Sequence, residues 1–209
     1  MSKSRRGRSK VKLSRSLGIV LTPKAAKYFE RRPYPPGVHG RTRRRGQSEY
    51  AIRLLEKQRL RAQYGISEAQ LKIAFDHAKK QSGRVDDVLI GLLESRLDAV
   101  VARSGFARTT AQARQLVVHR HIGVNGSRVD KPSFQVKLGD VVHVLPKSRG
   151  LDVFRIAADG GHAEVIAKVP DYLDVNLEQL TTRFIRPPVR SEIPIQCELP
   201  LVVEFYAGR

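Results

Sequence analysis

Cysteine is scarce in this sequence, and no apolar run is long enough to cross a bilayer. Cys197 is the single cysteine among 209 residues, which excludes an internal disulfide and any metal site built from several cysteines. One cysteine fits a reducing cytosol, where a buried, inert thiol is its expected state. A secretory signal and a lipidation motif are also missing. We therefore expect a soluble cytoplasmic protein without a membrane partner.

Acidic residues are few where basic residues are dense. The chain carries 39 Lys and Arg against 20 Asp and Glu, and residues 1–61 alone hold 19 basic and 3 acidic side chains. A local surplus of this size repels itself unless phosphates neutralise it. With a membrane disfavoured, the composition predicts a protein that binds nucleic acid.

The motifs of common enzymes are missing as well. We find no phosphate-binding loop ending in Gly-Lys-Ser or Gly-Lys-Thr, no nucleophile elbow and no helical zinc-protease motif. His119 and His121 have no third ligand nearby, so RNA contact or helix capping is favoured over a metal. We expect no catalytic residue, no metal, no cofactor and no small-molecule substrate.

Residues 1–46 are basic and poor in periodic apolar residues. The prolines between Arg32 and Gly40 favour a stiff, extended strap. Such a segment buries too little to fold alone, so we expect a basic extended N-terminal arm that is mobile until it binds RNA. Tyr34 and His39 can stack on unpaired bases, although for Tyr34 packing against the prolines is equally favoured. Bidentate phosphate contacts are predicted for Arg31, Arg32, Arg41, Arg43, Arg44 and Arg45.

Residues 47–93 have the periodicity of a small helical domain. Helices are predicted over 48–64, 67–81 and 85–93, with Ser48 and Ser67 as N-caps. In the first helix, basic residues recur every four positions and therefore share one face, at a cost from like-charge repulsion. Solvated faces usually mix signs, so we predict a phosphate-contacting stripe. Its members are Arg53, Lys57 and Arg61.

Residues 94–170 predict a second basic module, with its core over 96–158. Helices are expected over 94–104 and from Thr109 or Thr110 to about His119, followed by a hairpin that turns at Asn125-Gly126. Arg96 has an acidic partner available in Asp98 or Glu94. The predicted RNA-contacting residues of this module are Arg108, Arg114, His119, Arg120, Asn125 and Arg128.

The last 60 residues, 150–209, hold six basic and nine acidic side chains and so do not suit a general polyanion binder. A strand is predicted over 165–169 and a short helix over 173–180. Residues 199–206 fit a helix with Pro200 in its first turn, and they fit a strand nearly as well.

Several motifs of the module resemble the RNA-binding module of the ribosomal small-subunit protein four family: RLDAVV (96–101), GFAR (105–108), ARQLV (113–117) and IGVNGSRV (122–129). Flanking motifs resemble the bacterial form of that family over nearly the whole chain. These are RPYPPGVHG (32–40), YAIRLLEKQ (50–58), YGISE (64–68), LLESRL (92–97) and LVVEFY (201–206).

The resemblance implies a structural constituent of the ribosome that binds the 5′ domain of 16S rRNA early and nucleates assembly of the body of the 30S subunit. It further implies contact with small-subunit ribosomal protein five, near where messenger RNA enters, and a role with that protein in translational accuracy. Some family members bind zinc through four N-terminal cysteines. This chain has none there, and residues such as Lys10, Lys12, Arg15 and Lys24 stand in their place.

The fold class implied is α+β: the arm, a small helical domain over 47–93 that is completed by about 171–209, and an inserted module of helices on a small antiparallel sheet. Two other functions are less consistent with the sequence. An RNA-modifying enzyme such as a pseudouridine synthase needs a catalytic domain, and the last 60 residues, 150–209, are too few for one. Stress-related binders of stalled ribosomal complexes are shorter and lack the N-terminal strap.

Truncation of residues 1–46 is expected to weaken RNA affinity and to flatten its dependence on salt, because fewer counterions are released. The remaining domains are expected to stay folded. Filter binding over a series of salt concentrations measures both quantities, and an unchanged affinity and slope would refute the phosphate role of the arm.

Overall fold

The computed structural model describes residues 9–42, 46, 48–162 and 169–208, which form two compact units. The first unit combines the described residues up to Gln63 with those from Gln196 onwards, and the second runs from Tyr64 to Ile195. These units divide the chain at other places than the domains predicted over 1–46, 47–93 and 94–170. No helix in the described ranges is long and apolar enough to cross a membrane.

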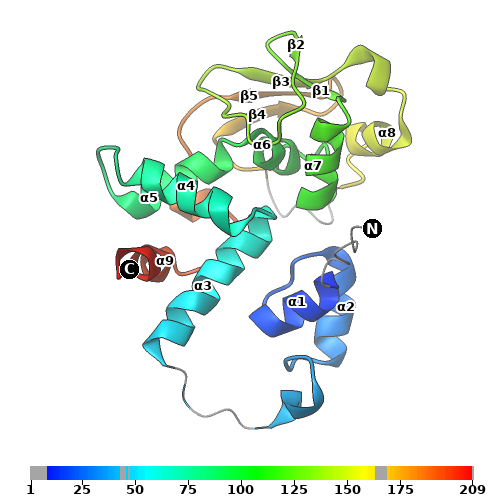
Figure 1. Ribbon diagram of the computed structural model, residues 1–209. Coiled ribbons are helices and arrows are strands. Elements are labelled where there is room, and N and C mark those ends of the chain that lie inside the picture. Colours follow the sequence, from blue (N-terminus) through cyan, green and yellow to red (C-terminus); the bar gives the residue numbers. More distant parts are fainter. Residues whose placement is uncertain (1–8, 43–45, 47, 163–168, 209) are drawn as a thin grey trace, which may run out of the picture. The chain divides into compact units, whose positions relative to one another are not determined.

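In the first unit, the N-terminal segment is helical. α1 (Lys10–Leu17) and α2 (Pro23–Arg31) pack against each other and are followed by the 3-10 helix η1 (Val38–Arg41) (Figure 1). The extended arm predicted over 1–46 is therefore wrong for much of residues 9–42. The reason is tertiary: Leu17, Ile19 and Ala25 are buried, and Arg59 Nε donates a hydrogen bond to the Leu17 carbonyl at 2.8 Å. The segment folds with the rest of its unit rather than alone.

α3 (Glu49–Tyr64) and α9 (Leu199–Ala207) complete the first unit. Ser48 Oγ accepts a hydrogen bond from the Ala51 amide at 3.3 Å, so the predicted helix and its cap are confirmed. The open alternative for residues 199–206 resolves as a helix with Pro200 in its first turn. Glu56 is buried and links α3 to the start of α9, because its carboxylate accepts from Arg59 at 2.5 Å and from the Glu198 amide at 3.0 Å.

The second unit begins with α4 (Glu68–Ala78) and α5 (Val85–Glu94), which confirm two predicted helices. Ser67 and Gln70 form a capping box at the start of α4. The helix predicted over 94–104 is confirmed over α6 (Leu97–Arg103), but its start is wrong, because the helical run breaks at residues 95–96. The break has a physical cause: the Val136 amide bonds to the Ser95 carbonyl at 2.7 Å, and Arg96 forms a β-bridge with Gln135.

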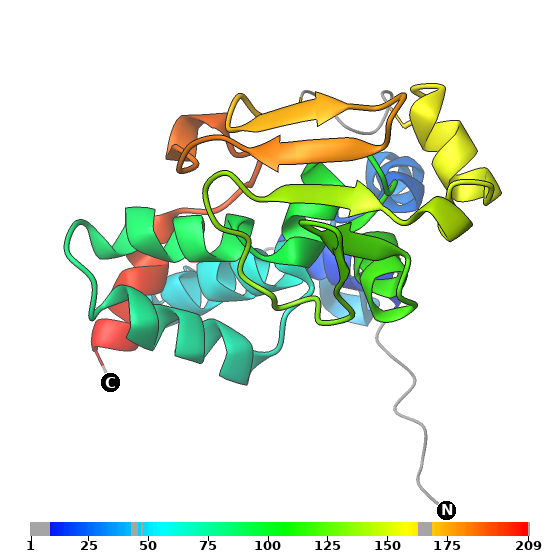
Figure 2. The ribbon, with the colours of Figure 1, turned by 90° about the horizontal axis from the view of Figure 1, so that it is seen from above.

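α7 (Thr110–Val118) follows α6, and the sheet comes next. The five strands of the described residues run in the order β2-β1-β3-β5-β4, all antiparallel. Their bounds are β1 Ile122–Val124, β2 Ser127–Arg128, β3 Val141–Val144, β4 Leu173–Asn176 and β5 Thr181–Phe184. α6 lies against one face of the sheet (Figures 1 and 2), and Val142, Val144 and Phe184 are buried. The α+β class and the hairpin at Asn125-Gly126 are confirmed.

The C-terminal part of this unit differs from the prediction. The helix expected over 173–180 is wrong: β4 occupies its first half, because Leu173 and Val175 alternate with polar residues and pair with β5. The strand expected over 165–169 lies almost entirely outside the described residues. Elements that the sequence pattern did not predict are β5, α8 (Asp152–Ala158) and the 3-10 helices η2 (Pro146–Ser148) and η3 (Arg190–Glu192).

Glu94 is the best connected buried group of the second unit. Its carboxylate, which is 0% exposed, accepts hydrogen bonds from the Tyr64 hydroxyl at 2.5 Å, the Tyr172 hydroxyl at 2.8 Å and the Arg103 guanidinium at 2.7 Å. Burial and the adjacent Glu94 charge raise the pKa of Tyr64 and of Tyr172 above the usual value. Both phenols therefore remain protonated donors well into the alkaline range.

Replacing Glu94 with Ala is expected to lower the free energy of unfolding by about 3–5 kcal/mol, because it leaves the guanidinium of Arg103 buried without its counter-ion. Urea unfolding followed by circular dichroism measures the change. Asp152→Ala is the matched control, since that carboxylate is 92% exposed and its loss is expected to change stability by no more than about 0.5 kcal/mol. Equal effects of the two substitutions would contradict the role of Glu94.

Candidate RNA interface

The start of α7 presents an exposed cation beside a capped helix terminus. Thr109 Oγ1 accepts from the Gln112 amide at 3.2 Å, and Gln112 Oε1 accepts from the Arg108 amide at 2.8 Å. These two bonds fix the turn that carries Arg108, whose side chain is exposed. A guanidinium next to a helix N-terminus is well placed to attract phosphate.

Arg114 projects from α7 and is oriented by a buried carboxylate. Asp98, which is 5% exposed, pairs with both nitrogens of the Arg96 fork at 3.0 and 2.8 Å and also contacts Arg114 at 3.4 Å. Of the two partners left open for Arg96, Asp98 is therefore the one found. Arg96 is buried and structural, whereas the Arg114 side chain remains 42% exposed.

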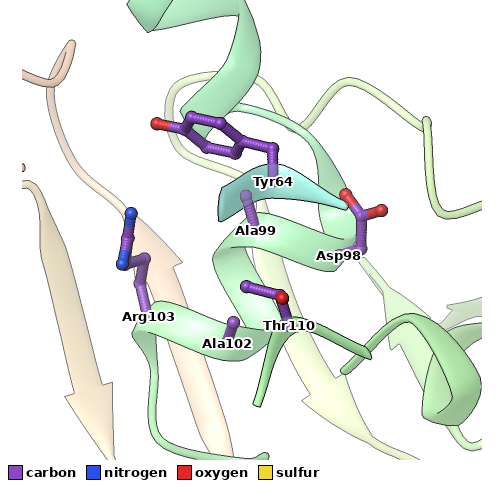
Figure 3. Close-up of a pocket in the computed structure, with 6 residues that line it drawn as sticks. All are labelled: Tyr64, Asp98, Ala99, Ala102, Arg103 and Thr110. Atoms are coloured by element: carbon purple, nitrogen blue, oxygen red, sulfur yellow. The ribbon is translucent and has the colours of Figure 1, made fainter. Parts of the chain in front are cut away.

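A small pocket lies next to the start of α7 (Figure 3). Both charged groups in its wall are committed elsewhere, since Asp98 binds two arginines and Arg103 binds Glu94. We therefore assign the pocket no ligand. Its lining residues are Tyr64, Asp98, Ala99, Ala102, Arg103 and Thr110.

The end of α7 and the hairpin carry further cations. His119, Arg120 and Arg128 are exposed, and Arg120 forms a 3.1 Å ion pair with Asp130. Arg128 lies on β2, at one edge of the sheet. His121 instead bonds through Nδ1 to Ser148 Oγ at 2.9 Å, and burial together with His119 lowers its pKa. No group of three metal-ligating side chains occurs among the residues that the structure describes.

Asn125 is exposed and stabilises the hairpin turn, and the RNA contact predicted for it stays a prediction. Its φ is 49°, its Oδ1 accepts from the Val141 amide at 2.9 Å, and its Nδ2 donates to Asp140 at 2.8 Å. Both ends of the amide are therefore used within the sheet. Other exposed cations follow the hairpin and belong to no motif, so the pattern could not reveal them; they include Lys131, Lys137, Lys147 and Arg149.

The stripe predicted along α3 does not form one exposed surface. Lys57 is only 4% exposed, and its ammonium lies 4.1 Å from the centroid of the Phe205 ring. Arg53 pairs with Glu49 and Glu204, both at 2.9 Å. α9 covers the Lys57 side chain, and the phosphate role of Lys57 stays a prediction. Arg61 is half-buried.

The predicted cations of the N-terminal segment are exposed where the structure describes them. Arg31, Arg32, His39 and Arg41 are exposed, whereas Tyr34 is half-buried. Arg41 donates to the Tyr34 hydroxyl at 3.0 Å, so the ring packs against cations as well as lying among prolines. Arg43, Arg44 and Arg45 lie outside the described residues.

The second unit combines a capped helix and a tight hairpin with arginines around both, which is the arrangement of an S4-type RNA-binding domain. Residues 95–142 match the family described as S4 domain. Residues 5–94 match Ribosomal protein S4/S9 N-terminal domain. The chain is 61% identical over 209 residues to small ribosomal subunit protein uS4 of Clavibacter michiganensis subsp. michiganensis, covering 100% of both chains. It is 59% identical over 207 residues to that of Beutenbergia cavernae, covering 99% of this chain and 100% of the relative. The chain belongs to the small ribosomal subunit protein uS4 family.

Arg108→Gln and Arg128→Gln are each expected to weaken RNA binding and to reduce the slope of log affinity against log salt by about 1, because each removes one phosphate contact. Filter binding at several salt concentrations measures the slope. Arg84→Gln is the control: Arg84 is equally exposed, but it is paired with Asp86 at 2.7 Å. A slope that falls as much for the control as for the two variants would count against this interface.

Proposed function

We propose that this chain is a structural component of the small ribosomal subunit that binds the 5′ domain of 16S rRNA directly. The observation that carries the proposal is the set of exposed arginines along α7 and the hairpin. Arg108 and Arg128 form no ion pair within the described ranges. Their backbone is held in place, for Arg108 by the hydrogen bond to Gln112 and for Arg128 by pairing within the hairpin. Arginines on a fixed backbone are preorganised for phosphate, since little conformational freedom is lost when they bind it.

We extend the proposal to assembly. Binding to the 5′ domain would occur early and nucleate the body of the 30S subunit. Two basic surfaces on one chain support this, because each lies in a separate compact unit and each can hold a different RNA segment. A protein that joins two segments lowers the entropic cost of bringing them together, as an early assembly step requires.

We also propose that this chain has a role in translational accuracy. Small-subunit ribosomal protein five is the proposed protein partner, with messenger RNA near where it enters the subunit. The composition of residues 150–209 is consistent with a protein contact, since nine acidic against six basic side chains do not favour phosphate. Tyr50 and Ile52 are exposed at the start of α3, and exposed apolar side chains of this kind suit a protein contact better than a contact with phosphate.

An RNA-modifying enzyme is the alternative of another class. After residues 95–142, which match the S4 domain, the described chain holds only the end of β3, η2, α8, β4, β5, η3 and α9. The two charged groups that line the pocket beside α7, Asp98 and Arg103, are already paired with Arg96 and Glu94, so they are not available as catalytic groups. The structural role therefore remains the better supported of the two.

Filter binding tests the proposed function with fragments of small-subunit ribosomal RNA and with transfer RNA as competitor, at physiological salt. We expect a 5′-domain fragment to bind at least about tenfold more tightly than transfer RNA, because specific contacts add to the general phosphate attraction. If no fragment outcompetes transfer RNA, the proposal fails.

A further inference from the structure

Arg15, Tyr34 and Arg41 form a compact group in the first unit, which we call the Tyr34 cluster. The guanidinium carbons of Arg15 and Arg41 lie 5.0 and 4.8 Å from the centroid of the Tyr34 ring. Neither arginine forms an ion pair with a carboxylate within the part of the chain that the structure describes. Two fixed positive charges therefore share one aromatic ring, and no carboxylate of the described residues neutralises them.

Arg15 is held by the backbone of the proline strap. Its Nε donates to the carbonyls of Arg32 and Tyr34, each at 3.0 Å, and its terminal nitrogen donates to the Pro35 carbonyl at 3.4 Å. Carbonyl groups satisfy the donors on one side of the guanidinium but do not neutralise its charge. Arg15 was absent from the predicted RNA contacts, because nothing in its sequence surroundings shows that it reaches residues 32–35.

Arg41 is placed by a close approach of backbone to backbone. A Cβ atom at Gly40 would lie 2.0 Å from the Pro35 carbonyl oxygen and 3.3 Å from the Tyr34 ring, so only glycine fits there. This approach brings η1 against the strap, and Arg41 then donates to the Tyr34 hydroxyl at 3.0 Å.

The surroundings of the Tyr34 hydroxyl are positive. The hydrogen bond from Arg41 is the main cause that lowers the pKa of Tyr34; desolvation opposes it, and the charges of Arg41, Arg32 and Arg15 add to it. Like charges brought together in this way repel one another, and an anion between or beside them relieves the repulsion.

We propose that Arg15 and Arg41 together bind backbone phosphate of RNA, and that Tyr34 is a positioning residue that holds both guanidiniums rather than a platform on which a base stacks. The inference rests on the proposed function, because it takes the phosphate to be that of ribosomal RNA. Arg15 thereby becomes an RNA-contacting residue, and Gly40 becomes a requirement for the site.

The experiment uses the full chain and a 5′-domain fragment of 16S rRNA in a salt series. Arg15→Gln and Arg41→Gln are each expected to bind roughly tenfold more weakly, with a salt slope reduced by about 1. Gly40→Ala is expected to act like Arg41→Gln, because its Cβ displaces η1. Arg84→Gln is the control, and thermal melting of each variant checks that it is folded.

Tyr34 variants separate positioning from stacking. Tyr34→Phe keeps the ring and loses the bond to Arg41, so it is expected to bind severalfold more weakly, whereas a stacking ring would tolerate this change. Tyr34→Leu added to the Arg15→Gln, Arg41→Gln double variant is expected to cost no further affinity, because Tyr34 acts through the two arginines. A stacking residue would cost a further factor of roughly ten.

Two results would overturn the inference: wild-type affinity and slope in both arginine variants, or a full additional loss from Tyr34→Leu in the double variant. Failure of the proposed function is distinguishable, since the wild-type chain would then prefer no 16S fragment over transfer RNA. In that case single-stranded poly(U) replaces the fragment, because it offers the same phosphates. An unchanged slope with poly(U) in Arg15→Gln and Arg41→Gln would again refute the cluster.

Discussion

The buried carboxylate of Glu94 organises the second unit. Its three donors, Tyr64, Arg103 and Tyr172, come from the end of α3, from α6 and from the segment before β4. A charge removed from water in this way is tolerated only when every partner is in place. The same contacts therefore fix α6 relative to its neighbours, and α6 in turn carries Asp98, which orients Arg114. A buried carboxylate thus helps to set the position of an arginine that is predicted to contact RNA.

Arginines in this chain divide into two kinds according to their partners. Arg53, Arg96 and Arg103 are paired with carboxylates and serve the fold. Arg108 and Arg128 stand exposed on a fixed backbone and form no ion pair within the described residues. The chemical groups are identical, so the division comes from tertiary structure alone. A net charge of +19 overstates the cations that phosphate can reach, because part of it is neutralised inside the fold.

Local signals in the sequence predicted local structure well. The Ser67 capping box and the Asn125-Gly126 turn each need only a few adjacent residues, and both are found. Predictions failed where distant segments decide the outcome. The helix over 94–104 breaks because residues 134–136 pair with its start, and the N-terminal segment is helical because α3 supplies its missing contacts. The same holds in the candidate site, since no local signal in the sequence shows that α9 packs over Lys57.

The first unit is built from both ends of the chain, and this has a consequence for synthesis. A chain is made from its N-terminus, so the residues from Tyr64 to Ile195 are complete before Gln196 exists. Glu56 cannot receive the Glu198 amide, nor can Phe205 cover Lys57, until the last dozen or so residues have been added. α3 therefore waits longest for part of its packing, although its contact with the N-terminal helices can form early. Vectorial synthesis makes the second unit the earlier folding nucleus and leaves the packing of α9 on α3 until last.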